Sequence, residues 1–164
     1  MNPLAESAVL PDHCRGKAGP RLASAGPKTR MKELKDGIRA HVRLDWNGHV
    51  HKRFRGTDAE QRYATEVAVL KVLEERGCPH VPRVLEEYPE ELYFVSTNCG
   101  QPADSISKDR ADRLFAELER DYGVRHLDPE PRNITYDARA GRFCIIDFEL
   151  AEILPKPGSE TEHR

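Results

Sequence analysis

The sequence predicts an α+β fold, with a small antiparallel sheet and one helix followed by a second part that contains another helix. Three observations support this class. Apolar and polar residues alternate between residues 38 and 54 on either side of Asn47-Gly48, as in a β-hairpin. Apolar residues then recur at helical spacing between residues 59 and 76. A third stretch, residues 126–149, combines a polar loop with a short apolar strand.

In the predicted hairpin, the alternation places Lys52 on the same face as Val50 and Phe54. The Lys52 ammonium therefore points toward the apolar side of the sheet. A lysine in such a place more often covers apolar surface with its stem. The other interpretation is that the ammonium holds an anion, and the hairpin alone leaves both open.

The elements after the hairpin follow from turn and cap signals. Thr57 and Glu60 have the spacing of a capping box, which predicts a helix that begins there and ends at Arg76-Gly77. Two further strands, residues 84–88 and 91–97, are predicted around a Pro-Glu turn and complete the first sheet.

A second helix is predicted over residues 105–122, because four apolar residues fall on one helical face and Gly123 follows. Two short strands joined by a turn at residues 137–141 come next. The apolar residues of the helical face are Ile106, Leu114, Phe115 and Leu118.

Residues 126–149 carry the side chains that point to a chemical function. His126, Asp128 and Asn133 fit H-x-D-x-x-x-x-N, and the apolar run 143–146 ends on Asp147. Two strands joined by the turn would bring Asp128, Asn133 and Asp147 to one end of a hairpin. Phosphoryl transfer from ATP needs such a set, an acceptor for a hydroxyl proton and oxygen ligands for Mg²⁺. A single Asp is more often a turn or cap residue, but the joint pattern favours catalysis.

These motifs resemble the catalytic loop and metal-binding segment of the protein-kinase-like superfamily, which includes small atypical kinases and the choline and aminoglycoside phosphotransferases. The resemblance covers residues 35–154. It implies a two-lobed kinase-like fold in a domain of residues 31–154. The N-terminal lobe would be residues 31–100, and residues 101–154 would form a truncated helical C-terminal lobe.

The resemblance also implies roles for individual residues. Asp128 would be the catalytic base, and Asn133 and Asp147 would hold Mg²⁺. Lys52 would bind the α- and β-phosphates of ATP and pair with Glu66. Further implied contacts are Val50 at the adenine, Thr97 and Cys99 in the hinge beside it, Gly37 in the loop over the phosphates, and Arg132 as a positive charge for the γ-phosphate.

Three features depart from the pattern of protein kinases. Gly37 alone stands where a G-x-G-x-x-G loop is expected, and Glu130 occupies a position that is often Lys. Asp-Phe-Glu at residues 147–149 replaces Asp-Phe-Gly, as in the small-molecule phosphotransferases. We also expect no activation segment and no peptide-binding helices after residue 154.

The predicted function is therefore an ATP- and Mg²⁺-dependent phosphotransferase that acts on a hydroxyl acceptor, either a protein Ser/Thr or a small molecule. Two alternatives stay open. The chain can be a nucleotide-binding pseudokinase or regulatory module without turnover, or a fragment whose other half lies elsewhere.

Composition limits the other classes. With 164 residues the chain is long enough for one main domain. The net charge of −2 gives no reason to expect nucleic acid as a partner. The four cysteines form no C-x-x-C pair, which favours reduced thiols. No apolar run is long enough to span a membrane, so we expect a cytoplasmic protein.

The two ends of the chain differ from the middle. Residues 1–30 are rich in Pro and Gly and contain no aromatic residue, which predicts a disordered tail. A transit segment, or an over-called start with Met31 as the initiator, are the alternatives. Residues 155–164 are expected to form a polar C-terminal tail.

Overall fold

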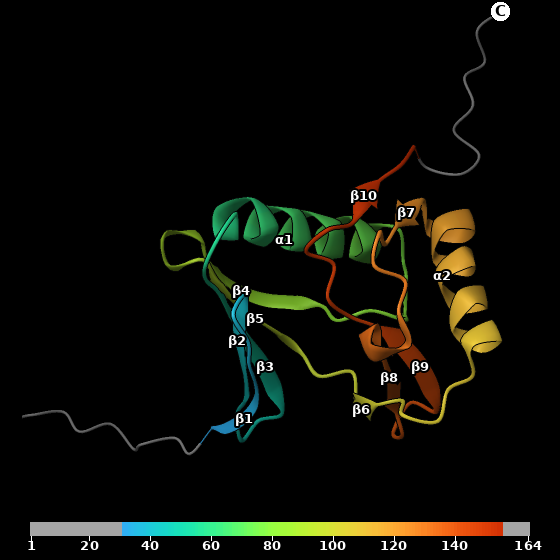
Figure 1. Ribbon diagram of the computed structural model, residues 1–164, viewed down its shortest axis with the longest axis horizontal. Helices are drawn as coiled ribbons and strands as arrows, with labels where there is room; N and C mark the ends of the chain where they lie inside the picture. The colour runs from blue at the N-terminus through green and yellow to red at the C-terminus, as the bar shows by residue number, and fades with distance from the viewer. Residues whose placement is uncertain (1–30, 156–164) are drawn as a thin grey trace, which may run out of the picture.

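The computed structural model describes residues 31–155 and has the predicted α+β architecture, with an antiparallel sheet and two α-helices among these residues (Figure 1). The expectations for residues 1–30 and 156–164 lie outside the described part of the chain. Within residues 31–155, no helix has both the length and the apolar character needed to cross a bilayer. Cys78, Cys99 and Cys144 are buried free thiols.

A five-stranded antiparallel sheet forms the N-terminal part, in the order β1-β2-β3-β5-β4. Its strands are β1 (Lys32–Asp36), β2 (Ala40–Leu44), β3 (His49–Phe54), β4 (Val84–Tyr88) and β5 (Tyr93–Thr97). A 3₁₀ turn, η1 (Pro89–Glu91), joins the last two strands where the Pro-Glu turn was predicted.

The first strand of the sheet was not predicted. All five residues of β1 are exposed, so its sequence carries no alternation between buried and exposed positions. Ile38, which we placed on the apolar face of the hairpin, lies outside the strands and is 91% exposed. The reason is a tight turn before β2, in which the Gly37 N–H donates to the Ala40 carbonyl.

Helix α1 (Ala59–Glu75) packs against β3 and β4. The C-terminal half of the helix lies beside β10 (Figure 1). The helix ends as predicted, but the capping box was wrong. The N-cap residue is Asp58, and its side chain makes no capping hydrogen bond. A capping box needs an extended N-cap backbone, whereas Asp58 is left-handed with φ 55°.

The C-terminal part contains more strand and less helix than we expected. Within the described residues its α-helix is α2 (Lys108–Tyr122), which starts three residues later than predicted because Ser107 is its N-cap. Short elements make up most of the rest: β6 (Gln101–Pro102), β7 (Val124–Arg125), η2 (Pro131–Asn133), β8 (Ile134–Asp137), β9 (Arg142–Ile145) and β10 (Glu152–Ile153). They pair as β6-β8-β9 and β10-β7.

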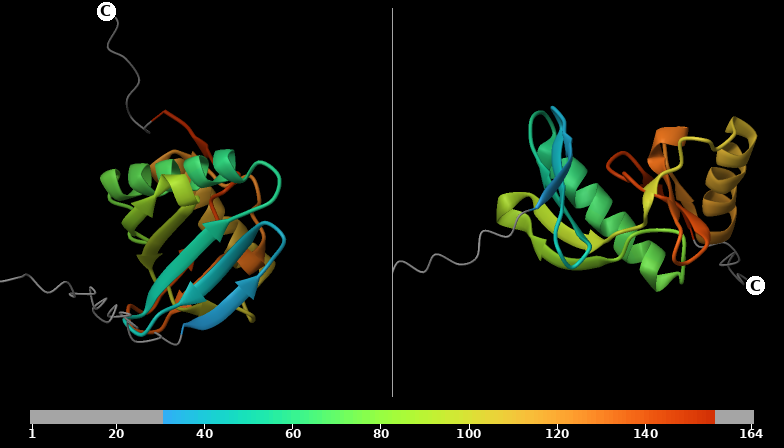
Figure 2. Two further views of the ribbon diagram at one scale, coloured as in Figure 1. Left: turned by 90° about the vertical axis from the view of Figure 1, so that its left-hand side faces the viewer. Right: turned by 90° about the horizontal axis from the view of Figure 1, so that it is seen from below.

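The two parts share one core. Buried apolar residues from α1, α2 and both sets of strands form a single cluster that includes Phe54, Leu70, Phe115, Ile134 and Phe148. Figure 2 shows the N-terminal sheet and α1 beside the smaller C-terminal elements, with the chain crossing between them after β5.

The segment that crosses between the two parts, residues 98–100, lies close to the backbone of β8 at Gly100. This residue has φ +92°, and a Cβ atom on it would lie 2.0 Å from the Tyr136 carbonyl oxygen. Only glycine meets both demands without strain. Gly100 therefore fixes how closely the crossing segment can approach the β8–β9 hairpin.

We expect Gly100→Ala to lower the free energy of unfolding by at least about 2 kcal/mol, because it adds a backbone clash to an unfavourable φ. Gly141→Ala is the matched control, since Gly141 has φ +65° and no atom within 4 Å of its Cβ position. Urea unfolding of both variants measures the difference. Equal losses would show that the close approach at Gly100 has no energetic weight.

Candidate functional site

A buried lysine joins three segments of the chain at the centre of the molecule. The Nζ atom of Lys52 on β3 lies 2.6 Å from Glu66 Oε2 on α1 and 2.6 Å from Asp147 Oδ1 after β9. Lys52 is 8% exposed, on the apolar side of the sheet as the alternation predicted. Its ammonium is held by two carboxylates, so it is not a surface lysine whose stem merely covers apolar area.

The charges of this cluster depend on one another. Burial would lower the pKa of Lys52, but the carboxylates of Glu66 and Asp147 raise it above its ordinary value. Burial would also raise the pKa of Asp147, but the Lys52 ammonium holds it below its ordinary value. Burial raises the pKa of Glu66 to about 7; Asp147 and Glu149 add to this rise, and Lys52 opposes it.

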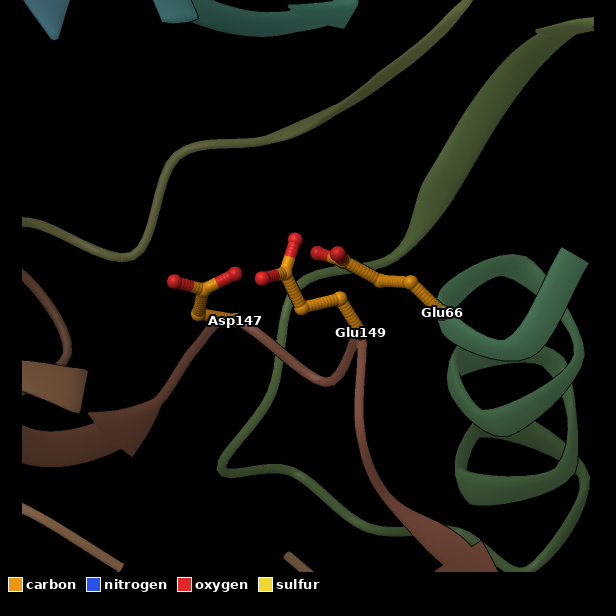
Figure 3. Close-up of side chains that lie close together, drawn as sticks. All are labelled: Glu66, Asp147 and Glu149. Carbon is orange, nitrogen blue, oxygen red and sulfur yellow. The ribbon is translucent and has the colours of Figure 1, made fainter. Parts of the chain in front are cut away.

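A third carboxylate lies close to the two that bind Lys52. Glu66, Asp147 and Glu149 each place one oxygen within 4.8 Å of the others, and their side chains converge from α1 and from the segment after β9 (Figure 3). Asp147 is left-handed with φ 69°, which turns the chain sharply between its strand and Glu149. Carboxylate oxygens in such a group are the ligand type that Mg²⁺ prefers.

The predicted base and its neighbours form a second group on the loop before β8. Arg132 Nη2 donates to Asp128 Oδ1 at 2.8 Å and to Oδ2 at 3.0 Å. The Asn133 Nδ2 group donates to the Asp128 carbonyl and to Oδ2, both at 2.9 Å. Asp128 is thus held from two sides, and the Asn133 amide oxygen is left as the atom that can bind a cation.

Backbone contacts connect the two groups. The Ile146 N–H donates to the Asn133 carbonyl at 2.9 Å, one residue before Asp147. His126 Nε2 donates to the Ile146 carbonyl at 3.0 Å, and the His126 ring lies between those of Phe115 and Phe148. The H-x-D-x-x-x-x-N loop is therefore fixed to the segment that carries Asp147.

The other residues for which contacts with ATP were predicted have no hydrogen bond or ion pair with Lys52, the carboxylates or Asp128. Val50 precedes Lys52 by two residues on β3. Thr97 Oγ1 accepts from the Arg83 N–H at 2.9 Å, and the Cys99 carbonyl accepts from Thr135 Oγ1 at 2.7 Å. Gly37 lies in the turn between β1 and β2, where its carbonyl accepts from the Arg55 side chain.

Two residues at the cluster received no role from the sequence. Glu149 completes the group of carboxylates, and Arg62 donates to Glu149 Oε2 at 3.0 Å. Arg62 is one helical turn before Glu66 and therefore on the same face of α1. The spacing of Arg62 from Glu66 and the Asp-Phe-Glu motif were the sequence signals that could have indicated these two residues. Helical spacing alone does not show whether an arginine is buried or exposed.

Comparisons with known proteins agree with a distant kinase-like relationship. The chain is 26% identical over 151 residues to serine/threonine-protein kinase ppk34 of Schizosaccharomyces pombe (strain 972 / ATCC 24843). The alignment covers 80% of this chain and 42% of that protein, so the chain spans less than half of its relative's length. No family model matches the sequence.

The raised pKa of Glu66 predicts a specific pH dependence. The folded state binds the Glu66 proton more tightly than the unfolded chain, whose ordinary pKa is 4.5. The contribution of this group to stability is therefore complete below pH 4.5 and is lost as pH rises toward 7. Between pH 5.5 and 7, we expect the wild type to lose about 1 to 2 kcal/mol relative to Glu66→Gln.

Urea unfolding of the wild type and Glu66→Gln across this pH range provides the measurement. Glu119→Gln is a control, because Glu119 has a lowered pKa and lies outside the cluster. A constant difference between the wild type and Glu66→Gln would show that Glu66 titrates at its ordinary pKa.

Proposed function

We propose that this protein is an ATP- and Mg²⁺-dependent phosphotransferase with a two-lobed kinase-like fold, which transfers the γ-phosphate to a hydroxyl acceptor. The N-terminal lobe is residues 31–100 and the C-terminal lobe residues 101–154. The observation that carries the proposal is the Lys52 ammonium, bonded at 2.6 Å to both Glu66 and Asp147. The distant similarity to a serine/threonine kinase supports the same class.

In this proposal Lys52 binds the α- and β-phosphates, and Glu66 fixes the direction of the Lys52 side chain. Asp147 and the Asn133 amide oxygen hold Mg²⁺, which when bound neutralises phosphate charge. The donor set fits that ion, since both groups offer hard oxygen atoms and lie on segments joined by a backbone hydrogen bond.

Asp128 accepts the proton of the acceptor hydroxyl. Its carboxylate is one-third exposed, so an acceptor can reach it from solvent. Arg132 is more exposed still and holds both Asp128 oxygens. We assign Arg132 two tasks, orienting the base and offering positive charge to the γ-phosphate, in a loop where Glu130 supplies none.

The adenine would lie between Val50 and the crossing after β5. The Cys99 carbonyl already accepts from Thr135, and the Thr97 N–H already donates to the Arg83 carbonyl. We therefore assign the adenine edge to the Thr97 carbonyl and the Cys99 N–H. Gly37 would cover the phosphates from the turn before β2. The acceptor class, a protein Ser/Thr or a small molecule, and the cytoplasmic location stay predictions.

A nucleotide-binding pseudokinase is the second candidate, and the Gly37 turn favours it. In a phosphate-covering loop, glycines let the backbone approach the ligand closely. Here the Gly37 carbonyl is bound by the Arg55 side chain, and the residue has no left-handed backbone that requires glycine. Phosphate contacts from this turn would therefore be few, which would weaken transfer more than binding.

Two substitutions separate the candidates. Asp128→Asn removes the proton acceptor, so transfer should fall by about 10² to 10⁴-fold while nucleotide affinity stays the same. Asp147→Asn removes a charged ligand, so both Mg²⁺-dependent affinity and transfer should fall. Transfer is measured with γ-labelled ATP and Mg²⁺, offering the protein itself, a peptide mixture and small alcohols as acceptors.

Asp109→Asn is the control, since Asp109 lies in the first turn of α2, away from both groups. Labelling that survives Asp128→Asn would mean that the assigned base is wrong. A wild type that binds Mg²⁺-ATP and labels no acceptor would favour the pseudokinase. Absence of nucleotide binding would contradict both candidates.

A further inference from the structure

Arg62 is a buried arginine whose guanidinium makes five hydrogen bonds. It is 5% exposed. Nε and Nη2 donate to the Thr57 carbonyl at 3.2 and 2.8 Å, and Nη2 also donates to the Arg55 carbonyl at 2.8 Å. Nη1 donates to the Arg39 carbonyl at 3.2 Å and to Glu149 Oε2 at 3.0 Å. All five N–H donors of the side chain therefore have partners.

These partners belong to segments that are far apart in the sequence. Arg39 precedes β2, Arg55 and Thr57 connect β3 to α1, and Glu149 follows Asp147 by two residues. Three of the partners are uncharged carbonyls, so Glu149 is the carboxylate that neutralises the buried guanidinium. Removing one member of a buried charge pair leaves the other without compensation, which is strongly unfavourable.

The Arg62–Glu149 pair also determines which cation binds which carboxylate in the cluster. Three carboxylates lie within 4.8 Å of one another (Figure 3). Arg62 binds Glu149, and the Lys52 ammonium is thereby left to Glu66 and Asp147. Without Arg62, Glu149 would be paired with the exposed Arg39 at 3.5 Å and would have no buried partner, so it would become a third anion competing for the same ammonium. Its repulsion would act on Asp147, its neighbour but one.

We propose that Arg62 is a positioning residue, which acts through Glu149 to hold the Asp147 carboxylate where a metal–nucleotide complex needs it. Phe148 lies between the two acidic residues and is fully buried, so a shift of the backbone at Glu149 is passed to Asp147 through one packed residue. This inference rests on the proposed function, because it names the group that orients the metal ligand of that site.

The test compares Arg62→Gln with Arg76→Gln, a matched control at the C-cap of the same helix. Arg76 also ties α1 to the C-terminal part, donating to the carbonyls of Tyr122, Gly123 and Leu154 at 2.7, 3.0 and 3.1 Å. It contacts no member of the carboxylate cluster. Both variants lose helix-end contacts, but Arg62→Gln alone removes the buried partner of Glu149. Glu149 then keeps the exposed Arg39 guanidinium, whose Nη1 lies 3.5 Å from its Oε1.

The first measurement is the affinity of the full chain for a fluorescent ATP analogue, with Mg²⁺ and with EDTA. Arg62→Gln should lower the ratio of the two affinities by about 10-fold or more, as loss of a group that orients a metal ligand typically does. Arg76→Gln should lower the melting temperature and leave the ratio unchanged. Arg62→Lys, which keeps the charge, should recover part of the ratio. An unchanged ratio in folded Arg62→Gln would overturn the inference.

The second measurement does not need nucleotide. Backbone hydrogen exchange at residues 146–151 should become faster in Arg62→Gln than in Arg76→Gln at equal distance from each melting temperature. Equal exchange would overturn the inference, whether or not the wild type binds Mg²⁺-ATP. A wild type without Mg²⁺-dependent binding, combined with faster exchange, would contradict the proposed function and support the positioning contact. If Arg62→Gln does not fold, Arg62→Lys, which loses most of the guanidinium hydrogen bonds, is used for both measurements, with the same expected directions and smaller changes.

Discussion

The burial of one ammonium group between two carboxylates is the constraint on which the rest of the structure depends. Removing Lys52, Glu66 and Asp147 from water is unfavourable unless their charges compensate at close range. They come from a strand, a helix and the segment after a second hairpin, so compensation requires all three elements to be in place together. The shared apolar core supplies the stability that this polar centre by itself does not.

The sequence predicted the elements whose side chains show a period or a clear stop signal. The hairpin around Asn47-Gly48, helix α1 and the β8–β9 turn all have such signals, and the direction of Lys52 followed from alternation alone. Prediction from the sequence failed for β1, where no residue is buried and no alternation exists. It also failed at Asp58, where a rare left-handed backbone replaces the extended one of a capping box. The strands β6, β7 and β10 of the C-terminal part were missed, because elements of two residues leave no period to detect.

The candidate site was predictable to a similar extent. The motif spacing predicted that Asp128, Asn133 and Asp147 lie near one another. The structure places the first two in direct contact and connects the third to them through a backbone hydrogen bond. The buried contacts of Arg62 could not be predicted, because three of its partners are backbone carbonyls from two separate segments, before β2 and between β3 and α1. Carbonyl acceptors have no side-chain signature, so a motif cannot reveal a residue that binds them.

Helix α1 is bonded to the C-terminal part at both ends, by Arg62 near its start and by Arg76 just after its end. A helix held only in the middle can pivot, but one held at both ends can neither tilt nor slide without breaking one set of contacts. Regulation by an outward swing of this helix would therefore be unfavourable in this chain. The side chains of Asp128 and Arg132 are more exposed, so a binding partner could reach them with less rearrangement of the fold.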